Sequence, residues 1–130
     1  MKCFFCIICF LLALEHTSAQ DHTDPVAPVL ELTEVDQQPE FPGGLENCYT
    51  FFYKNFKKPE VPELIGKIYI SFIVEPDGTL TDIRSDRNPG FGTGAEAERV
   101  MQLSPKWIPG KKAGQRVRVK YILTLGIHTD

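Results

Sequence analysis

The stretch 66–75 constrains the fold most, because apolar side chains alternate through it with a period of two. Such alternation is typical of a strand with one face on a core. The side chains on that face are Ile68, Ile70, Phe72 and Val74. Pro76-Asp77-Gly78 follows at once, and proline and glycine suit the backbone angles of tight turns. The sequence therefore predicts a hairpin in which residues 79–84 return beside the first strand.

A second long strand is predicted over residues 116–125. Its apolar positions again alternate, at Val117, Val119, Tyr121, Leu123 and Leu125. A two-stranded hairpin is only marginally stable in water. We therefore expect this strand to join the hairpin in one sheet, and we expect helices to cover the apolar face of that sheet.

Two amphipathic segments can supply the cover. The first carries apolar residues at helical spacing, at Leu45, Cys48, Tyr49, Phe52 and Phe56, and Pro59 ends it. The second covers residues 95–103, with Thr93 as its expected N-cap and Glu96 completing a capping box. Trp107 lies in the turn that follows and is expected to be a core anchor.

Residues 1–19 have the pattern of a secretory signal peptide. Lys2 precedes an apolar run of twelve residues, 3–14, and Thr17-Ser18-Ala19 provides small residues for cleavage before Gln20. The run is shorter than the roughly 20 residues that a membrane span needs. Cleavage would release the mature chain from the membrane; the alternative is an uncleaved short anchor.

Residues 20–40 differ in composition from the rest of the chain. They contain six acidic residues, three prolines and no Lys or Arg, so we interpret them as a disordered or extended tether. A short edge strand within 29–35 is the alternative. Residues 41–130 form the one expected domain. They carry thirteen basic and ten acidic residues without a basic run, so nucleic-acid binding is not expected.

No motif in the chain gathers the residues that catalysis needs. The histidines, His16, His22 and His128, are scattered, and no Cys/His cluster has the spacing of metal ligands. After the signal peptide the only cysteine is Cys48, whose place on an apolar helix face indicates a buried side chain rather than a nucleophile. We therefore expect neither an enzyme nor a cofactor.

The sheet itself offers a binding surface. Outer strands have unpaired backbone groups, and adding a peptide strand to such an edge is a common mode of recognition. We expect the strand 116–125 to be an open edge that binds an extended peptide. The residues expected to contact this peptide are Arg116, Arg118, Lys120, Ile122 and Thr124.

Several sequence features of residues 40–130 occur together in a characteristic order. They are Glu40-Phe41-Pro42-Gly43-Gly44, the alternating strand that runs into Asp77-Gly78, the small-residue helix 95–103, Pro105-Lys106-Trp107-Ile108-Pro109-Gly110, and Gly114 before the last strand. This combination resembles the C-terminal domain of the TonB energy transducers, in the form common among Bacteroidetes bacteria.

The resemblance implies an α+β fold: a three-stranded antiparallel sheet with two helices packed on one face. It also implies binding of the TonB box of outer-membrane receptors beside the last strand. Asn55, Lys57 and Lys58 would be further receptor contacts. The family usually has Tyr-Pro after the first helix and Ala three residues later, whereas this chain has Lys58-Pro59 and Pro62.

Two hypotheses for the function follow. The first is a periplasmic TonB-like domain that binds the TonB box by strand addition and supports energy-dependent transport across the outer membrane. Because the family's membrane anchor and long Pro-rich spacer are not recognisable, coupling to the inner-membrane motor proteins would need an uncleaved N-terminus or a separate partner. The second is a soluble periplasmic scaffold module that forms a homodimer through the same edge and transduces no energy.

Overall fold

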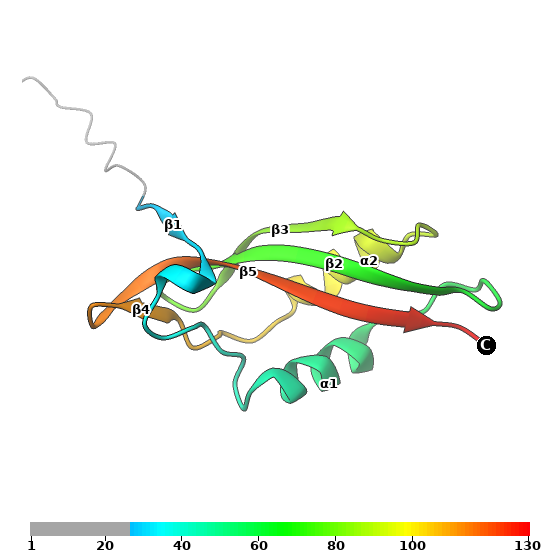
Figure 1. Ribbon diagram of the computed structural model, residues 1–130. Helices are drawn as coiled ribbons and strands as arrows, with labels where there is room; N and C mark the ends of the chain where they lie inside the picture. The colour runs from blue at the N-terminus through cyan, green and yellow to red at the C-terminus, as the bar shows by residue number, and fades with distance from the viewer. Residues whose placement is uncertain (1–26) are drawn as a thin grey trace, which may run out of the picture.

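The computed structural model describes residues 27–130. The expected signal peptide and the first residues of the expected tether lie outside this range. In chain order the elements are β1 (Val29–Leu30), η1 (Leu32–Glu34), α1 (Leu45–Asn55), β2 (Ile65–Val74), β3 (Leu80–Arg87), α2 (Thr93–Gln102), β4 (Gly110–Lys112) and β5 (Gln115–His128). The described part is therefore α+β, with two helices and one curled mixed sheet (Figure 1).

The sheet has five strands, whereas three antiparallel strands were expected. Its order is β1-β5-β2-β3, and β4 pairs with β5 beside this path. The antiparallel centre of β5, β2 and β3 matches the expectation, and β2 pairs with β5 without a shift from Ile65↔His128 to Val74↔Val119. The additional strands are a parallel β1 and a hairpin partner β4. Strands of two or three residues are too short to show the alternation that predicts longer ones.

One face of the sheet packs on both helices, which lie on the same side of it (Figure 1). Buried side chains alternate along β2 and β5, as predicted; they are Ile68, Ile70, Phe72, Val74, Val119, Leu123, Leu125 and Ile127. The helices contribute Cys48, Phe52, Ala97, Val100 and Met101 to the same core. Neither α-helix covers the opposite face of the sheet, which we call the open face (Figure 1).

Trp107 is the core anchor that the sequence predicts. Its side chain is 3% exposed, and its indole N–H donates to Ser104 Oγ at 2.9 Å. Its ring packs edge-on against Phe72 and Tyr121, with centroids 5.2 and 5.1 Å apart. The hairpin turn fits closely over this residue, because Gly78 has φ +87° and a Cβ there would lie 2.2 Å from the Trp107 carbonyl oxygen.

The second helix starts differently from the prediction. Its N-cap is Gly92, in the left-handed conformation, and Thr93 is already helical. The Thr93 hydroxyl donates backwards to the Gly90 carbonyl at 2.6 Å, so it caps no helical N–H group. Glu96 accepts from the Arg99 side chain instead of completing a capping box. The expected N-cap was wrong because the glycine at 92 turns the chain one residue earlier.

The sequence favoured a tether over residues 20–40, with a short edge strand within 29–35 as the alternative; in the described part of this segment, residues 27–40, the strand is present and the tether is corrected. β1 pairs with β5 through Val29↔Arg118 and Leu30↔Val119. Further on, the Gln37 and Lys111 backbones form a bridge, and the Asp36 carboxylate accepts the Ala113 N–H at 2.7 Å. Hydrogen bonds to distant strands thus hold this acidic segment on the domain, and composition alone does not reveal such partners.

Candidate peptide-binding edge

The register of β5 determines which of its backbone groups face away from β2. The Thr129 N–H donates to the Leu64 carbonyl at 2.9 Å, so odd-numbered residues of this strand direct their backbone groups toward β2. Because antiparallel strands alternate, even-numbered residues direct their N–H and C=O groups to the opposite edge. We call this the outer edge of β5.

β1 occupies the beginning of the outer edge. It pairs with Arg118 and Val119, while Arg116 lies in the hairpin opposite Lys111 of β4. The expectation that the edge is open from residue 116 onward is therefore wrong for the part beside β1. The remaining outward-facing residues are Lys120, Ile122, Thr124, Gly126 and His128.

Arg118 holds the start of β1 against β5. Its guanidinium group donates to the Glu75 carboxylate, with Nε 2.9 Å from Oε2 and Nη2 3.0 Å from Oε1, and to the Ala27 carbonyl at 2.9 Å. The hydrogen bond from Arg118 is the main cause that lowers the pKa of Glu75 below its usual value. Since Glu75 balances this cation, Lys120 is the next basic side chain along the strand, and it forms no ion pair with residues 27–130.

Beyond Val119, no strand within residues 27–130 pairs with the outer edge. Lys120, Ile122 and Thr124 also turn their side chains to the open face, and Ile122 is 53% exposed. Near the end of the strand, the Tyr53 hydroxyl donates to the Gly126 carbonyl at 2.9 Å. Burial is the main cause that raises the pKa of Tyr53, so this hydroxyl remains a donor at neutral pH. The outer edge is thus without a backbone partner among residues 27–130 from Lys120 to Thr124, and at Gly126 the carbonyl already has one side-chain partner.

The three expected receptor contacts after α1 lie in different places. Lys58 lines a pocket of about 470 Å³ together with Tyr53, Phe56 and the last residues of β5, 126–128. Asn55 is engaged elsewhere, because its side-chain amide donates to the Phe51 carbonyl and its own carbonyl accepts from Arg99. The structure therefore brings Lys58, but not Asn55, to the end of the outer edge.

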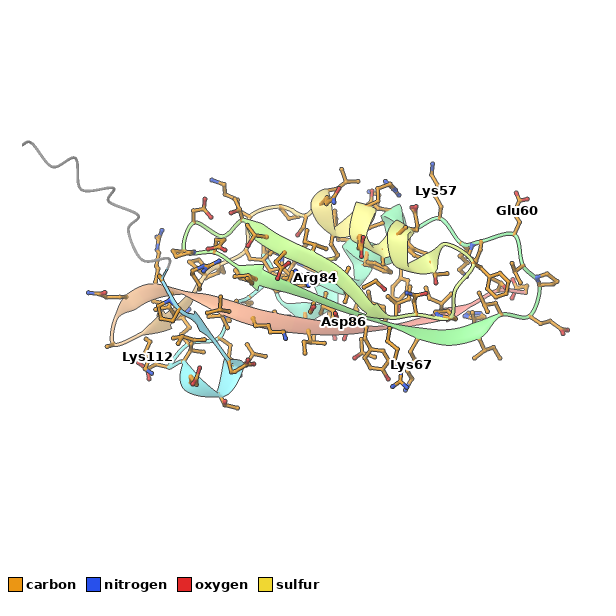
Figure 2. All side chains as sticks on the ribbon, turned by 90° about the horizontal axis from the view of Figure 1, so that it is seen from above. Lys57, Glu60, Lys67, Arg84, Asp86 and Lys112 are labelled. Atoms are coloured by element: carbon orange, nitrogen blue, oxygen red, sulfur yellow. The ribbon has the colours of Figure 1, made fainter. Side chains whose placement is uncertain are left out.

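Lys57 also lies apart from the edge. Its backbone N–H faces the Glu96 carboxylate of α2 at 3.4 Å. Figure 2 shows its side chain on the helix side of the strands, while Lys67 extends from the other side. Lys57 and the open face therefore cannot belong to the same binding surface.

Sequence reasoning missed three residues of this site: Tyr53, Gly126 and His128. The prediction ended the strand at residue 125, although Ile127 continues the buried alternation. Following the alternation of apolar residues two positions further, from 125 to 127, would have predicted the end of the strand. Nothing in the sequence indicates that Tyr53, on a helix 73 positions away, caps the carbonyl of Gly126.

Cys48 and the possible metal ligands of the described residues were the remaining candidates for chemistry. Cys48 is fully buried, as predicted, and burial raises its thiol pKa to about 11, so the thiolate that a nucleophile requires is not formed at neutral pH. Residues 27–130 contain no group of three or more His, Cys, Asp or Glu side chains that could hold a metal ion. Their helices are also too short or too polar to span a membrane.

The comparisons with known proteins add no assignment. Neither a protein-family model nor a curated protein matches this chain.

Proposed function

We propose that this protein is a TonB-like periplasmic domain that binds the TonB box of an outer-membrane transporter by strand addition. In this proposal it supports energy-dependent transport across the outer membrane, with the inner-membrane motor proteins as further partners. The observation that carries the proposal is the outer edge of β5 from Lys120 onward, which no strand of residues 27–130 pairs with and whose N–H and C=O groups point outward. The antiparallel core of β5, β2 and β3 under two helices supports the family resemblance.

Strand addition at this edge would leave the pairing between β5 and β2 intact. β2 holds the other edge of β5 along ten consecutive pairs, and Thr129 fixes the strand end through the carbonyl of Leu64. An added strand would satisfy the outward groups of residues 120–126, and the side chains of the partner would alternate between the open face and the α1 side. Backbone hydrogen bonds would supply the affinity, and the pockets near Gly126 would select among peptides by their side chains.

The test is an NMR titration of the full-length protein with N-terminal plug peptides from the outer-membrane receptors of the same genome. We expect amide shifts in residues 120–128 and none along β3. If no peptide binds at millimolar concentration, and the protein forms a dimer through this edge, the scaffold function replaces the transport function. Sedimentation velocity without peptide measures that dimer directly.

A further inference from the structure

Gly126 is a glycine that the fold does not require. Its φ lies outside the left-handed region, and a Cβ built on it would meet no described atom within 4 Å. It also stands inside a long strand, where glycine weakens pairing and leaves no side chain to pack. An alanine would therefore fit the described domain at this position without a clash.

A neighbouring glycine shows the contrast. Gly66 lies opposite Ile127 in the same ladder, and a Cβ on it would come within 2.8 Å of Pro89 Cβ. The chain itself therefore explains Gly66. For Gly126 the corresponding contact is missing among residues 27–130, and a glycine of this kind marks a place where another molecule approaches the strand.

The surroundings of Gly126 indicate what approaches. It lines a shallow pocket of about 440 Å³ with Ile65, Gly66, Lys67, Ile127 and His128. Lys67 is the cross-strand neighbour of Gly126, and Figure 2 shows it extending away from the helices. Ile65 is 83% exposed at the rim. The pocket thus combines a bare strand backbone, an aliphatic side chain and a cation on the open face.

We propose that this pocket receives an aromatic side chain of the bound strand, and that this side chain sets the register of binding. The inference rests on the proposed strand addition at the outer edge of β5. A partner residue opposite Gly126 would turn its side chain to the same face, because directly paired residues share a face. An aromatic ring can lie across a glycine of the neighbouring strand and cover its backbone.

The chemistry of the pocket favours a ring over an aliphatic chain. Lys67 can place its ammonium group over the face of the ring, and the rim residue Ile65 can pack against the ring edge. Tyr53 leaves the site usable, since a carbonyl oxygen has two lone pairs and the Tyr53 hydroxyl takes one at Gly126. Register selection by one anchor would also prevent the bound strand from sliding along the edge.

The experiment takes the best-binding plug peptide and remakes it with Phe, and separately with Ala, at each position in turn. Affinities for the full-length protein are measured by isothermal titration calorimetry. We expect Phe to exceed Ala at one position only, by roughly tenfold. At that position the ring should shift the Gly126 amide resonance by its ring current.

The variant Gly126→Val fills the pocket and should abolish the preference for Phe while the Ala peptide still binds. Gly126→Ala does so in part, and Thr124→Val, two residues earlier on the same face, is the matched control that keeps the preference. Thermal unfolding midpoints at or above that of the parent show that the Gly126 variants fold.

Two results would overturn the inference while leaving strand addition intact: equal binding of Phe and Ala at every position, or a preference that survives Gly126→Val. Failure of every peptide to bind at millimolar concentration would remove the proposed function itself, and this inference with it. A preference for Leu equal to that for Phe would reduce the pocket to a general apolar contact and would contradict the aromatic anchor.

Discussion

The two outer edges of the central sheet differ in regularity. β5 pairs with β2 along ten residues without a shift, whereas β3 shifts its register against β2 at two places. Asp82, inside β3, has φ +50°, which few residues other than glycine adopt. Bulges bend and twist a strand and interrupt its pairing. The backbone of β3 is therefore a poor template for an added strand, and that of β5 is a good one.

A carboxylate also blocks the β3 edge. Ser85 pairs with Ile70, whose own backbone groups face β5, so the Ser85 N–H points away from the sheet. Glu98 of α2 accepts this N–H at 2.8 Å. Edges that are bulged or covered resist pairing with other chains. The β3 edge is thus protected by the domain itself, while no strand of residues 27–130 pairs with the outer edge of β5 beyond the end of β1.

The largest expected loss of stability comes from a substitution in the core that supports both edges of the sheet. Trp107→Ala removes a ring that contacts both Phe72 of β2 and Tyr121 of β5. We expect a loss of about 3–5 kcal/mol in the free energy of unfolding, as for other large buried aromatic residues. Urea denaturation followed by circular dichroism measures it. A midpoint equal to that of the parent protein would show that the two edges do not depend on this common support.

Proline substitutions distinguish the residues of β5 whose N–H groups face outward from those whose N–H groups face β2. Ile122→Pro removes an outward N–H, so the domain should stay folded while peptide affinity falls by roughly tenfold or more, about 1.4 kcal/mol. Leu123→Pro is the matched control, because its N–H faces β2 and its loss should unfold the sheet. Circular dichroism and calorimetry measure both. Unfolding of Ile122→Pro, or undiminished binding by it, would contradict the assignment of the outer edge.

Removing the Glu98 carboxylate, which caps the edge of β3, should make that edge more open to pairing, as the outer edge of β5 is. Glu98→Ala frees the Ser85 N–H, and we expect a loss of about 1–2 kcal/mol in stability because a partly buried donor loses its charged acceptor. We also expect peptide-induced amide shifts to appear along β3. Glu98→Gln keeps an acceptor oxygen and is the control. Shifts confined to β5 in the alanine variant would show that the bulges alone protect β3.

The ion pair between Glu75 and Arg118, at the start of the outer edge of β5, should make the free energy of unfolding depend on pH in the acidic range. The pKa of Glu75 is lowered in the folded protein, chiefly by its hydrogen bond from Arg118, so the unfolded chain takes up the proton first. The stabilisation is complete above the usual glutamate pKa of about 4.3 and is lost as pH falls through the lower folded value. We expect Glu75→Gln to lack this component when unfolding is followed between neutral pH and about pH 3. An unchanged acid profile would disprove a role for the pair in stability.

The long, regular strands could be predicted from the sequence, whereas the short strand β1 and the cap on β3 depend on tertiary contacts. Ile68, Phe72 and Leu123 lie in long alternating runs, so their strands and buried face could be read locally. The pairing of β1 joins residues about ninety positions apart, and it depends on a partner that no local pattern specifies. The same holds for the Glu98 carboxylate, which reaches Ser85 only once α2 has packed on β3.

The smallest expected effect concerns the charge at the start of the open edge. Lys120 is exposed on the open face, and the bound strand is held by backbone groups, so Lys120→Ala should change peptide affinity by less than about 0.5 kcal/mol. Its effect should appear in the association rate for an acidic peptide, which we expect to fall roughly two- to threefold at low salt and to match the parent at high salt.

Stopped-flow fluorescence at several ionic strengths measures that rate. Lys112→Ala is the matched control, since it removes an equal charge from β4 at the end of the sheet opposite Glu60 (Figure 2). Lys112 pairs with Gln115, outside the stretch 120–126 of β5. Near 0.1 M salt, where the Debye length is about 10 Å, we therefore expect its removal to slow association less than Lys120→Ala does. Equal slowing by both variants would mean that the net charge of the domain, rather than the open edge of β5, attracts the peptide.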